Sequence, residues 1–450
     1  MTSGGKNLTE GPLARQILVF SLPLVLSNLL QAVFNMTDIA VVGRFAGSQA
    51  LGSVGSTTIF VTLMTGFLIG LGGGVNVLVA RFYGAEQPKD VEKAVHSALL
   101  VCLAAGVLLL VVGVGFSPAL MRLLGTKPDL IDGAILYLRI YFLGMPAMAI
   151  YNFGNGVFSA VGDTRKPLVY LTIAGVLNVV LDLFFVIVCK MSVAGAALAT
   201  ILTQYLSAFL ILRALARTEG CYGLQREKLH LDPVMTRSIL GLGVPAGCQN
   251  AIFALANLFI QASINTFDTV VVSGNAAAAN ADPLVYDVMA AFYTACASFM
   301  SQNYGAGKRE RVKRSYFISL GYSFGIGAVL GLSLVLFGQT FLSLFTTEPA
   351  VAEAGMQRLL VMGLSYPISA FMDCTIAASR GLGRTIVPTF IVIMGSCVFR
   401  VVWVYTVFAF FGTLLSLYLL FVCSWTVTAI AEVTYFAHTY KEQMRIYEKA

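Results

Sequence analysis

The chain has 450 residues, of which 58% are hydrophobic and only 11% are charged, and its mean hydropathy is +0.82. Soluble globular domains carry about 25% charged residues, so the composition excludes an ordinary soluble domain and indicates a membrane protein. The formal net charge of +7 comes from 29 Lys and Arg against 22 Asp and Glu.

The charges are clustered and leave apolar stretches long enough to cross about 30 Å of hydrocarbon as helices. Twelve such spans are predicted, in chain order: 15–42, 52–80, 94–117, 133–156, 167–189, 191–213, 237–263, 283–303, 314–338, 354–378, 386–410 and 413–438. No pair of the eight cysteines has C-x-x-C spacing, so neither a disulfide framework nor a zinc site is expected.

The basic residues predict the orientation of the chain. If the N-terminus lies on the cytoplasmic side, alternate loops place 22 of the 29 Lys and Arg on that side and 6 on the outer side. Arg358 is one of the outer six, and Arg400 alone lies within a span. Cytoplasmic loops carry an excess of Lys and Arg, so both termini are expected in the cytoplasm. The positive net charge is thus a topology signal, and no nucleic acid partner is expected.

The second half of the chain repeats the first. Pro23 and Asn35 recur at one constant offset as Pro245 and Asn257, and after a single deletion Gly162-x-Thr164-x-x-Pro167 recurs as Gly383-x-Thr385-x-x-Pro388. Two homologous membrane-embedded halves are typical of a transporter. The predicted organisation is a cytoplasmic N-terminus at 1–14, an N-lobe of six spans at 15–213, a cytoplasmic connector at 214–236, a C-lobe at 237–438 and a cytoplasmic C-terminus at 439–450.

Two acidic residues lie within spans of the N-lobe, where an ionisable side chain costs several kcal/mol and indicates function. Asp38 lies late in the first span, and Asp182 lies in the fifth span, four residues after Asn178 and therefore on the same helix face. Counted along the helices from the flanking charged residues, Thr200 and Tyr137 fall at the same outer depth. This set can hold Na⁺ or share protons; the plainer alternative is that each acid caps a helix or faces outer solvent.

The second copy has no matching acidic pair. Ile260 stands opposite Asp38, and Trp403 stands opposite Asp182. A packing requirement of the fold would appear in both halves, so the asymmetry favours a cation site that belongs to the N-lobe.

Other polar side chains within spans are candidates for lining a substrate cavity, although a hydrogen-bonded structural role is an equal alternative. They are Asn35, Asn152, Asn257, Asp287, Asp373 and Arg400. Arg400 is expected to pair with one of the nearby acids or with backbone carbonyls. Glu432, near the inner end of the last span, is expected at the membrane interface.

With the strings PLVLSNLLQAVFNMTDIAVVGRFAG, YGAEQ, SAVGDTRKP and LNVVLDLFF, the chain resembles the multidrug and toxic compound extrusion (MATE) transporters, and most closely their DinF-like branch. The resemblance implies an all-α membrane protein with two six-helix bundles around a central cleft. It implies export of amphipathic, often cationic compounds, driven by H⁺ or Na⁺, from a monomer in the inner membrane that needs no cofactor and catalyses no reaction. It assigns the cation-coupling site to Asp38, Tyr137, Asn178, Asp182 and Thr200, with Asp38, Asp182 and Asn178 as ligands if the ion is Na⁺.

The chain departs from the NorM-like branch of that family, which carries a Glu in the seventh span. The corresponding stretch here, VPAGCQNAIFALAN, has no acidic residue, so a C-lobe cation site of that type is not expected, and Asp373 and Asp287 are the acids that leave room for another one. Pro23 matches the proline where the first helix is proposed to bend. The rival interpretation is a flippase of the same superfamily for lipids or lipid-linked saccharides, which calls for several Arg or Lys in the cavity; the lone Arg400 disfavours it.

Overall fold

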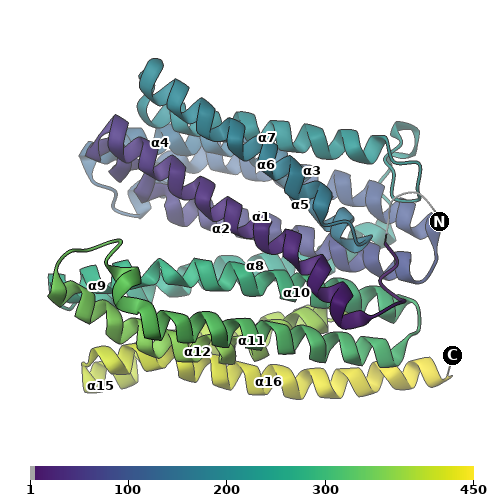
Figure 1. Ribbon diagram of the computed structural model, residues 1–450. Coiled ribbons are helices and arrows are strands. Elements are labelled where there is room, and N and C mark those ends of the chain that lie inside the picture. The colour runs from purple at the N-terminus through teal and green to yellow at the C-terminus, as the bar shows by residue number, and fades with distance from the viewer. Residues whose placement is uncertain (1–5, 450) are drawn as a thin grey trace. The chain divides into compact units, whose positions relative to one another are not determined.

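The computed structural model describes residues 6–449, and its regular structure there is entirely helical (Figure 1). The helices before the connector are α1 (Leu13–Val41), η1 (Val42–Ala46), α2 (Ser48–Gly84), α3 (Pro88–Leu123), α4 (Pro128–Leu143), α5 (Met145–Ala160), α6 (Arg165–Leu183), η2 (Phe184–Val188) and α7 (Ser192–Ala216). A short helix, η3 (Arg226–Lys228), lies in the connector. Residues 1–5 and 450 of the predicted cytoplasmic termini lie outside the described residues.

The second half follows the same order with more interruptions. Its helices are α8 (Pro233–Ile264), α9 (Thr269–Ala279), α10 (Ala281–Gly305), α11 (Arg309–Leu342), α12 (Pro349–Gly381), α13 (Ile386–Val392), η4 (Ile393–Val398), α14 (Phe399–Trp403), η5 (Val404–Phe408), α15 (Ala409–Phe411) and α16 (Leu414–Lys449).

The predicted number of membrane spans is confirmed in the part of the chain that the structure describes. Eleven helical segments are long and apolar enough to cross a membrane, and the bent pair α4–α5 makes a twelfth. The eighth span was predicted from residue 283, whereas its helical segment begins at Thr269, because α9 and α10 follow each other directly. An alanine run at 276–279 has high helix propensity but low hydrophobicity, which hid this extension from the sequence.

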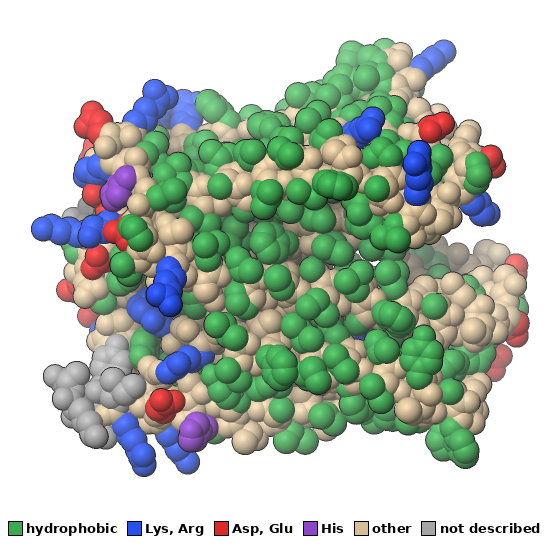
Figure 2. All heavy atoms as spheres, turned by 180° about the vertical axis from the view of Figure 1, so that it is seen from behind, with side chains coloured by type: hydrophobic (Ala, Val, Ile, Leu, Met, Phe, Trp, Pro, Cys, Tyr) green, Lys and Arg blue, Asp and Glu red, His purple; other side chains and the backbone are tan. Residues whose placement is uncertain are grey.

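The outer surface of the helices is apolar. Leu108 and Val111 on α3 and Val329 and Leu336 on α11 are all more than half exposed. On the face seen in Figure 2, hydrophobic side chains cover the middle of the molecule, and the charged side chains gather toward the ends of the helices. A soluble monomer seldom exposes so large an apolar area, so this surface fits a hydrocarbon environment.

The repeat seen in the sequence is also present in the backbone. Gly162 and its counterpart Gly383 both have φ of +81°, a conformation that favours glycine. In each half this glycine N–H donates to the carbonyl three residues earlier, Ser159 or Arg380. The glycines therefore recur because the same tight turn ends a helix in both halves.

One matched proline has different consequences in the two halves. Near Pro146 the span is broken at Gly144, and α4 and α5 are bent by 46°. Its counterpart Pro367 lies inside the unbroken helix α12. A proline removes one helical hydrogen bond but does not by itself decide whether the helix breaks; in the first half the neighbouring glycine allows the break.

The helices pack into two compact units whose composition does not follow chain order. The first unit contains residues 26–251 and residues 6–7, and the second contains residues 8–25 and the rest of the chain from residue 252. The first helix of each half therefore begins in one unit and ends in the other. The lobe boundaries at 15–213 and 237–438 stay a prediction from the repeat.

The exchanged helix segments are held by close packing. In the first unit, α8 approaches α2 so closely that a Cβ added at Gly70 would meet the backbone of Gly247. In the second unit, Phe20 of α1 packs edge to face on Phe299 of α10, with ring centroids 5.4 Å apart. Both contacts bury apolar surface, and the glycines of α2 and α8 serve helix packing.

Candidate functional site

The first unit encloses a cavity of about 400 Å³ among α1, α2, α4, α5, α6 and α7, here called the N-lobe cavity. Four of the five predicted coupling residues line it: Asp38, Tyr137, Asn178 and Thr200. The fifth, Asp182, is completely buried directly behind its wall and forms no part of the lining.

The carboxyl groups of Asp38 and Asp182 are neighbours. They lie close enough for one of them, when protonated, to donate a hydrogen bond to the other. Among the described residues, no donor group reaches either oxygen of Asp182 or Oδ1 of Asp38. Two adjacent acids with three carboxylate oxygens that no described donor reaches need a proton or a cation between them, because desolvation and mutual repulsion both oppose a double negative charge.

The three other predicted residues surround this pair. Thr200 Oγ1 donates a hydrogen bond to Asp38 Oδ2 at 3.3 Å. Asn178 is buried one helical turn before Asp182, and its Nδ2 has no hydrogen-bond partner among the described residues. Tyr137 lies beside both carboxyl groups and stacks on Tyr141, with ring centroids 5.9 Å apart.

Irregular helix geometry accompanies each acid. Asp38 lies just before the π-helical turn η1, and Asp182 lies just before the π-helical turn η2. A π-helical turn widens the backbone by one residue and shifts the side chains that follow it. Such turns are frequent at functional sites, and here they directly follow α1 and α6, the two helices that carry the acids.

The oxygen-rich set of the N-lobe cavity fits a hard monovalent cation or a proton. No group of three or more His, Cys, Asp or Glu with metal-binding geometry occurs within residues 6–449. Carboxylate, amide and hydroxyl oxygens are nevertheless suitable ligands for Na⁺. Asn35 and Asn152, predicted to line a substrate cavity, both line this one, and Asn152 Nδ2 donates to the Met148 carbonyl at 2.9 Å.

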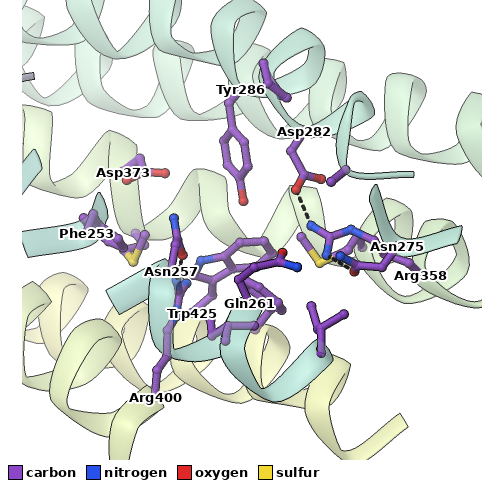
Figure 3. Close-up of a pocket in the computed structure, with 17 residues that line it drawn as sticks. Phe253, Asn257, Gln261, Asn275, Asp282, Tyr286, Arg358, Asp373, Arg400 and Trp425 are labelled. Carbon is purple, nitrogen blue, oxygen red and sulfur yellow. Dashed lines mark hydrogen bonds and ion pairs between the residues drawn. The ribbon is translucent and has the colours of Figure 1, made fainter. Parts of the chain in front are cut away.

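The second unit contains a cavity of about 420 Å³, here called the C-lobe cavity, among α8, α9, α10, α12, α14 and α16 (Figure 3). Three of the predicted substrate-cavity residues line it: Asn257, Asp373 and Arg400. Asp287 is half-buried on α10 and is not part of the wall of either cavity. Ile260, the counterpart of Asp38, also lines the C-lobe cavity.

Arg358 lies inside the second unit, although its position in the sequence predicted a place outside the membrane. It is only 5% exposed and lies on the cavity wall. Its guanidinium donates to Asp282 Oδ2 at 2.5 Å and to Asn275 Oδ1 at 2.7 Å. Tyr366 donates to the other oxygen of Asp282 at 2.5 Å. Proximity to a predicted loop misled the assignment, because α12 begins at Pro349 and has already entered the unit at residue 358.

Arg400 is 3% exposed and its partners are neutral side chains. Nε donates to Ser424 Oγ and Nη1 donates to Asn257 Oδ1, both at 3.2 Å. The guanidinium also lies 4.9 Å from the ring centroid of Phe421 and 5.6 Å from that of Phe253. The expected pairing with an acid or a backbone carbonyl is wrong for the residues that the structure describes.

A second correction concerns Glu432, which was expected at the interface. Its side chain is completely buried, and neither carboxylate oxygen has a hydrogen-bond partner in the described part of the chain. Arg380 of α12 is its charged neighbour. Asp282, Tyr286 and Trp425 were missed altogether, since an acid near a predicted span end and two aromatics in apolar helices carry no signal of their own.

Two homologous halves of membrane-spanning helices, each with a polar cavity among its helices, define a membrane transporter. The MatE family model matches the chain twice, at residues 23–184 and 245–406, and the two matches correspond to the two copies of the repeat. The chain belongs to the MatE family, the MATE transporters, as the sequence motifs predicted.

Individual relatives agree with this assignment. "Probable multidrug resistance protein YpnP" of Bacillus subtilis (strain 168) is 30% identical, over 80% of this chain and 81% of that protein. An "FAD transporter" of Shewanella oneidensis is 26% identical over 80% of each chain. A solved MOP superfamily transporter from Pyrococcus furiosus superimposes with a TM-score of 0.92 over 98% of this chain and 99% of that chain, at 22% identity. The last likeness concerns the fold alone.

Proposed function

We propose that the protein is an H⁺- or Na⁺-coupled antiporter that exports amphipathic, often cationic, drug-like compounds across the cell's inner membrane. The observation that carries this proposal is the Asp38–Asp182 pair, in which Asp38 lines the N-lobe cavity and Asp182 is buried behind it, with three carboxylate oxygens that no described donor reaches. A charge pair of this kind is costly in a membrane unless it binds a cation.

Coupling follows from competition for the same carboxylates. A proton or Na⁺ entering from outside neutralises Asp38 and Asp182, whereas a cationic compound in the N-lobe cavity is attracted by their negative charge. Cation binding therefore weakens drug binding, and drug binding disfavours the cation by the same free energy. Two relatives support drug-like compounds as the substrate class: the probable multidrug resistance protein YpnP of Bacillus subtilis and the multidrug export protein MepA of Staphylococcus aureus.

Transport is expected to occur by alternating access, with both termini in the cytoplasm and the protein acting as a monomer among membrane lipids. Pro23 is the proposed bending point of the first helix. It lies three residues before Leu26, where the helix passes from one packing unit to the other. No cofactor and no nucleic acid take part in this mechanism.

The test is dye export from proteoliposomes loaded with ethidium, with the membrane potential clamped by ionophores. An inward H⁺ gradient at equal Na⁺ and an inward Na⁺ gradient at equal pH are applied separately. Wild-type protein is expected to release dye under one of them, and Asp38→Asn and Asp182→Asn are expected to lose at least nine-tenths of that release. Asp132→Asn, on the exposed face of the helix that carries Tyr137, is the matched control. Gradient-driven export at the wild-type rate by both buried variants would exclude the N-lobe pair as the coupling site.

Flippase activity toward lipid-linked saccharides is the second candidate, and one observation favours it. Sequence reasoning disfavoured it because only Arg400 was placed within a span, but Arg358 is buried in the C-lobe cavity as well. Arg358 is, however, neutralised by Asp282, which leaves less positive charge than a pyrophosphate requires. Translocation of a fluorescent lipid pyrophosphate by folded protein, with no movement of ethidium under either gradient, would favour the flippase.

A further inference from the structure

The C-lobe cavity contains four charged side chains, and only two of them are paired. Both carboxylate oxygens of Asp282 have partners, because one is in an ion pair with Arg358 and the other accepts a hydrogen bond from Tyr366. Arg358 in turn donates to Asn275 and lies over the rings of Tyr418 and Phe421. These contacts form a closed, neutral cluster on one wall (Figure 3).

Arg400 lies on another wall without a carboxylate in ion-pair contact among the described residues. No carboxylate of the described residues lies within ion-pair distance of it, and its Nε and Nη1 bonds go to the neutral acceptors Ser424 and Asn257. Nη2 has no hydrogen bond to any described residue, so at least one donor is left for a ligand. A guanidinium that is almost completely buried needs an anion, because burying an unpaired charge is expensive.

Asp373 does not supply that anion. It lines the same cavity from α12, yet it makes no ion pair or hydrogen bond with any described residue. Figure 3 shows the carboxyl group of Asp373 directed into the cavity and apart from the guanidinium of Arg400, with Tyr286 pointing into the cavity beside them. A second negative charge on a ligand would come close to the carboxyl group of Asp373 and be repelled by it. The cavity therefore suits a ligand with one anionic group.

Aromatic side chains form the rest of the binding surface. Tyr286 and Trp425 pack edge to face with ring centroids 6.0 Å apart, and Trp425 packs on Phe421 at 5.8 Å. All three line the cavity. Small-molecule pockets of about 300–1,000 Å³ typically combine such apolar walls with a few placed polar groups, and this cavity falls in that range.

We infer that the C-lobe cavity is a second ligand site, which binds aromatic compounds through a single carboxylate held by Arg400. The planar guanidinium donates charge-assisted hydrogen bonds to a carboxylate, and the ring system of the ligand packs against the aromatic walls. The inference concerns a different cavity from the cation-coupling pair and does not depend on which ion drives transport.

The test uses dansylglycine and dansylglycinamide, which share one ring system and differ in a carboxylate against a neutral amide. Binding is measured by equilibrium dialysis against protein in nanodiscs of uncharged phosphatidylcholine, with empty nanodiscs as the blank. Wild-type protein is expected to bind dansylglycine about 10- to 100-fold more tightly than the amide, as a hydrogen-bonded charge pair gives.

Three variants locate the preference. Arg400→Gln is expected to abolish it, Arg400→Lys to restore part of it through the retained charge, and Asp132→Asn on the exposed face of α4 to leave it unchanged. Equal binding of the two compounds by wild-type protein overturns the inference, whether or not the variants fold. A carboxylate preference that persists in folded Arg400→Gln would also overturn it, because another side chain would then hold the anion.

Discussion

The two cavities occupy corresponding halves of a duplicated chain, yet they contain different charged side chains, with only acids in one and both acids and arginines in the other. In the N-lobe two neighbouring acids have three carboxylate oxygens that no described donor reaches, whereas in the C-lobe an arginine is paired with an acid and another arginine has hydrogen bonds only to neutral partners. At the position of Asp38 the C-lobe has Ile260, and Ile260 still lines the cavity. The repeat thus conserves where a cavity forms, through its turns and glycines, and leaves the charge of the cavity free to diverge.

The largest expected difference between the lobes concerns stability. Arg358→Gln leaves the partly buried Asp282 without its counter-charge and is expected to destabilise the protein by about 3 kcal/mol. Asp38→Asn neutralises one member of a like-charged pair, so stability is expected to stay the same or rise. Thermal denaturation followed by size-exclusion chromatography measures both. The double variant Arg358→Gln/Asp282→Asn should recover at least half of the loss, and a single variant as stable as wild type would show that the ion pair has no net effect.

The packing of corresponding helices provides a second, smaller difference. In the C-lobe, α11 and α12 are in backbone contact, because a Cβ added at Gly331 would meet the carbonyl oxygen of Gly363. The counterpart of Gly363 in the N-lobe is Phe142, and its ring packs against Gly113 of α3. Gly331→Ala is expected to cost about 1–3 kcal/mol, because helix backbones must separate. Gly325→Ala on the same helix meets nothing within 4 Å and is the control. Equal melting temperatures for the two variants would contradict this account.

Moving the N-lobe acid into the C-lobe sharpens the comparison further. Ile260→Asp places a carboxylate in the cavity that contains Arg400, at the position where the other half has Asp38. The new acid is expected to pair with Arg400 and to reduce dansylglycine affinity about tenfold, equivalent to roughly 1.4 kcal/mol. Ile260→Asn, of nearly the same shape and uncharged, should retain affinity. Similar losses in both variants would point to packing instead of charge.

The smallest expected effect concerns the starts of the two corresponding helices. Asp232 caps α8 by accepting from the N–H groups of Val234 and Met235 at 2.9 and 3.0 Å, and these bonds lower the pKa of its carboxyl group. Its counterpart, Glu10, instead lies 3.6 Å from Lys308.

A lowered pKa stabilises the folded state above the unfolded value of about 3.9, and this contribution disappears as the pH falls through the folded value. Asp232→Ala should therefore lower the melting temperature slightly at pH 7, by less than Gly331→Ala does, and the difference from wild type should shrink as the pH falls below the unfolded value of about 3.9. A difference that stayed constant over this range would exclude the cap charge as its cause.

The two lobes also differ in how much the sequence could predict. Asp38 and Asp182 stood out because acids are rare in apolar spans, and the i, i+4 spacing already placed Asn178 on the correct face. The Arg358–Asp282 pair could not be found this way, since both residues lie near predicted span ends and their contact depends on how α10 packs on α12. Pro146 and Pro367 are matched in sequence, and only tertiary packing decides that one helix breaks and the other continues.

The division of α1 and α8 between the packing units has a consequence for the origin of the chain. Residues 8–25 complete the second unit, and the corresponding start of α8 completes the first, so each half lends its opening segment to the other. Exchange of identical elements between two copies is the arrangement of a domain-swapped dimer. Here the exchange is fixed within one polypeptide by gene duplication and fusion. A single repeat cut out at the connector would lack the segment that fills its own core, and two such fragments would have to exchange their first helices to fold.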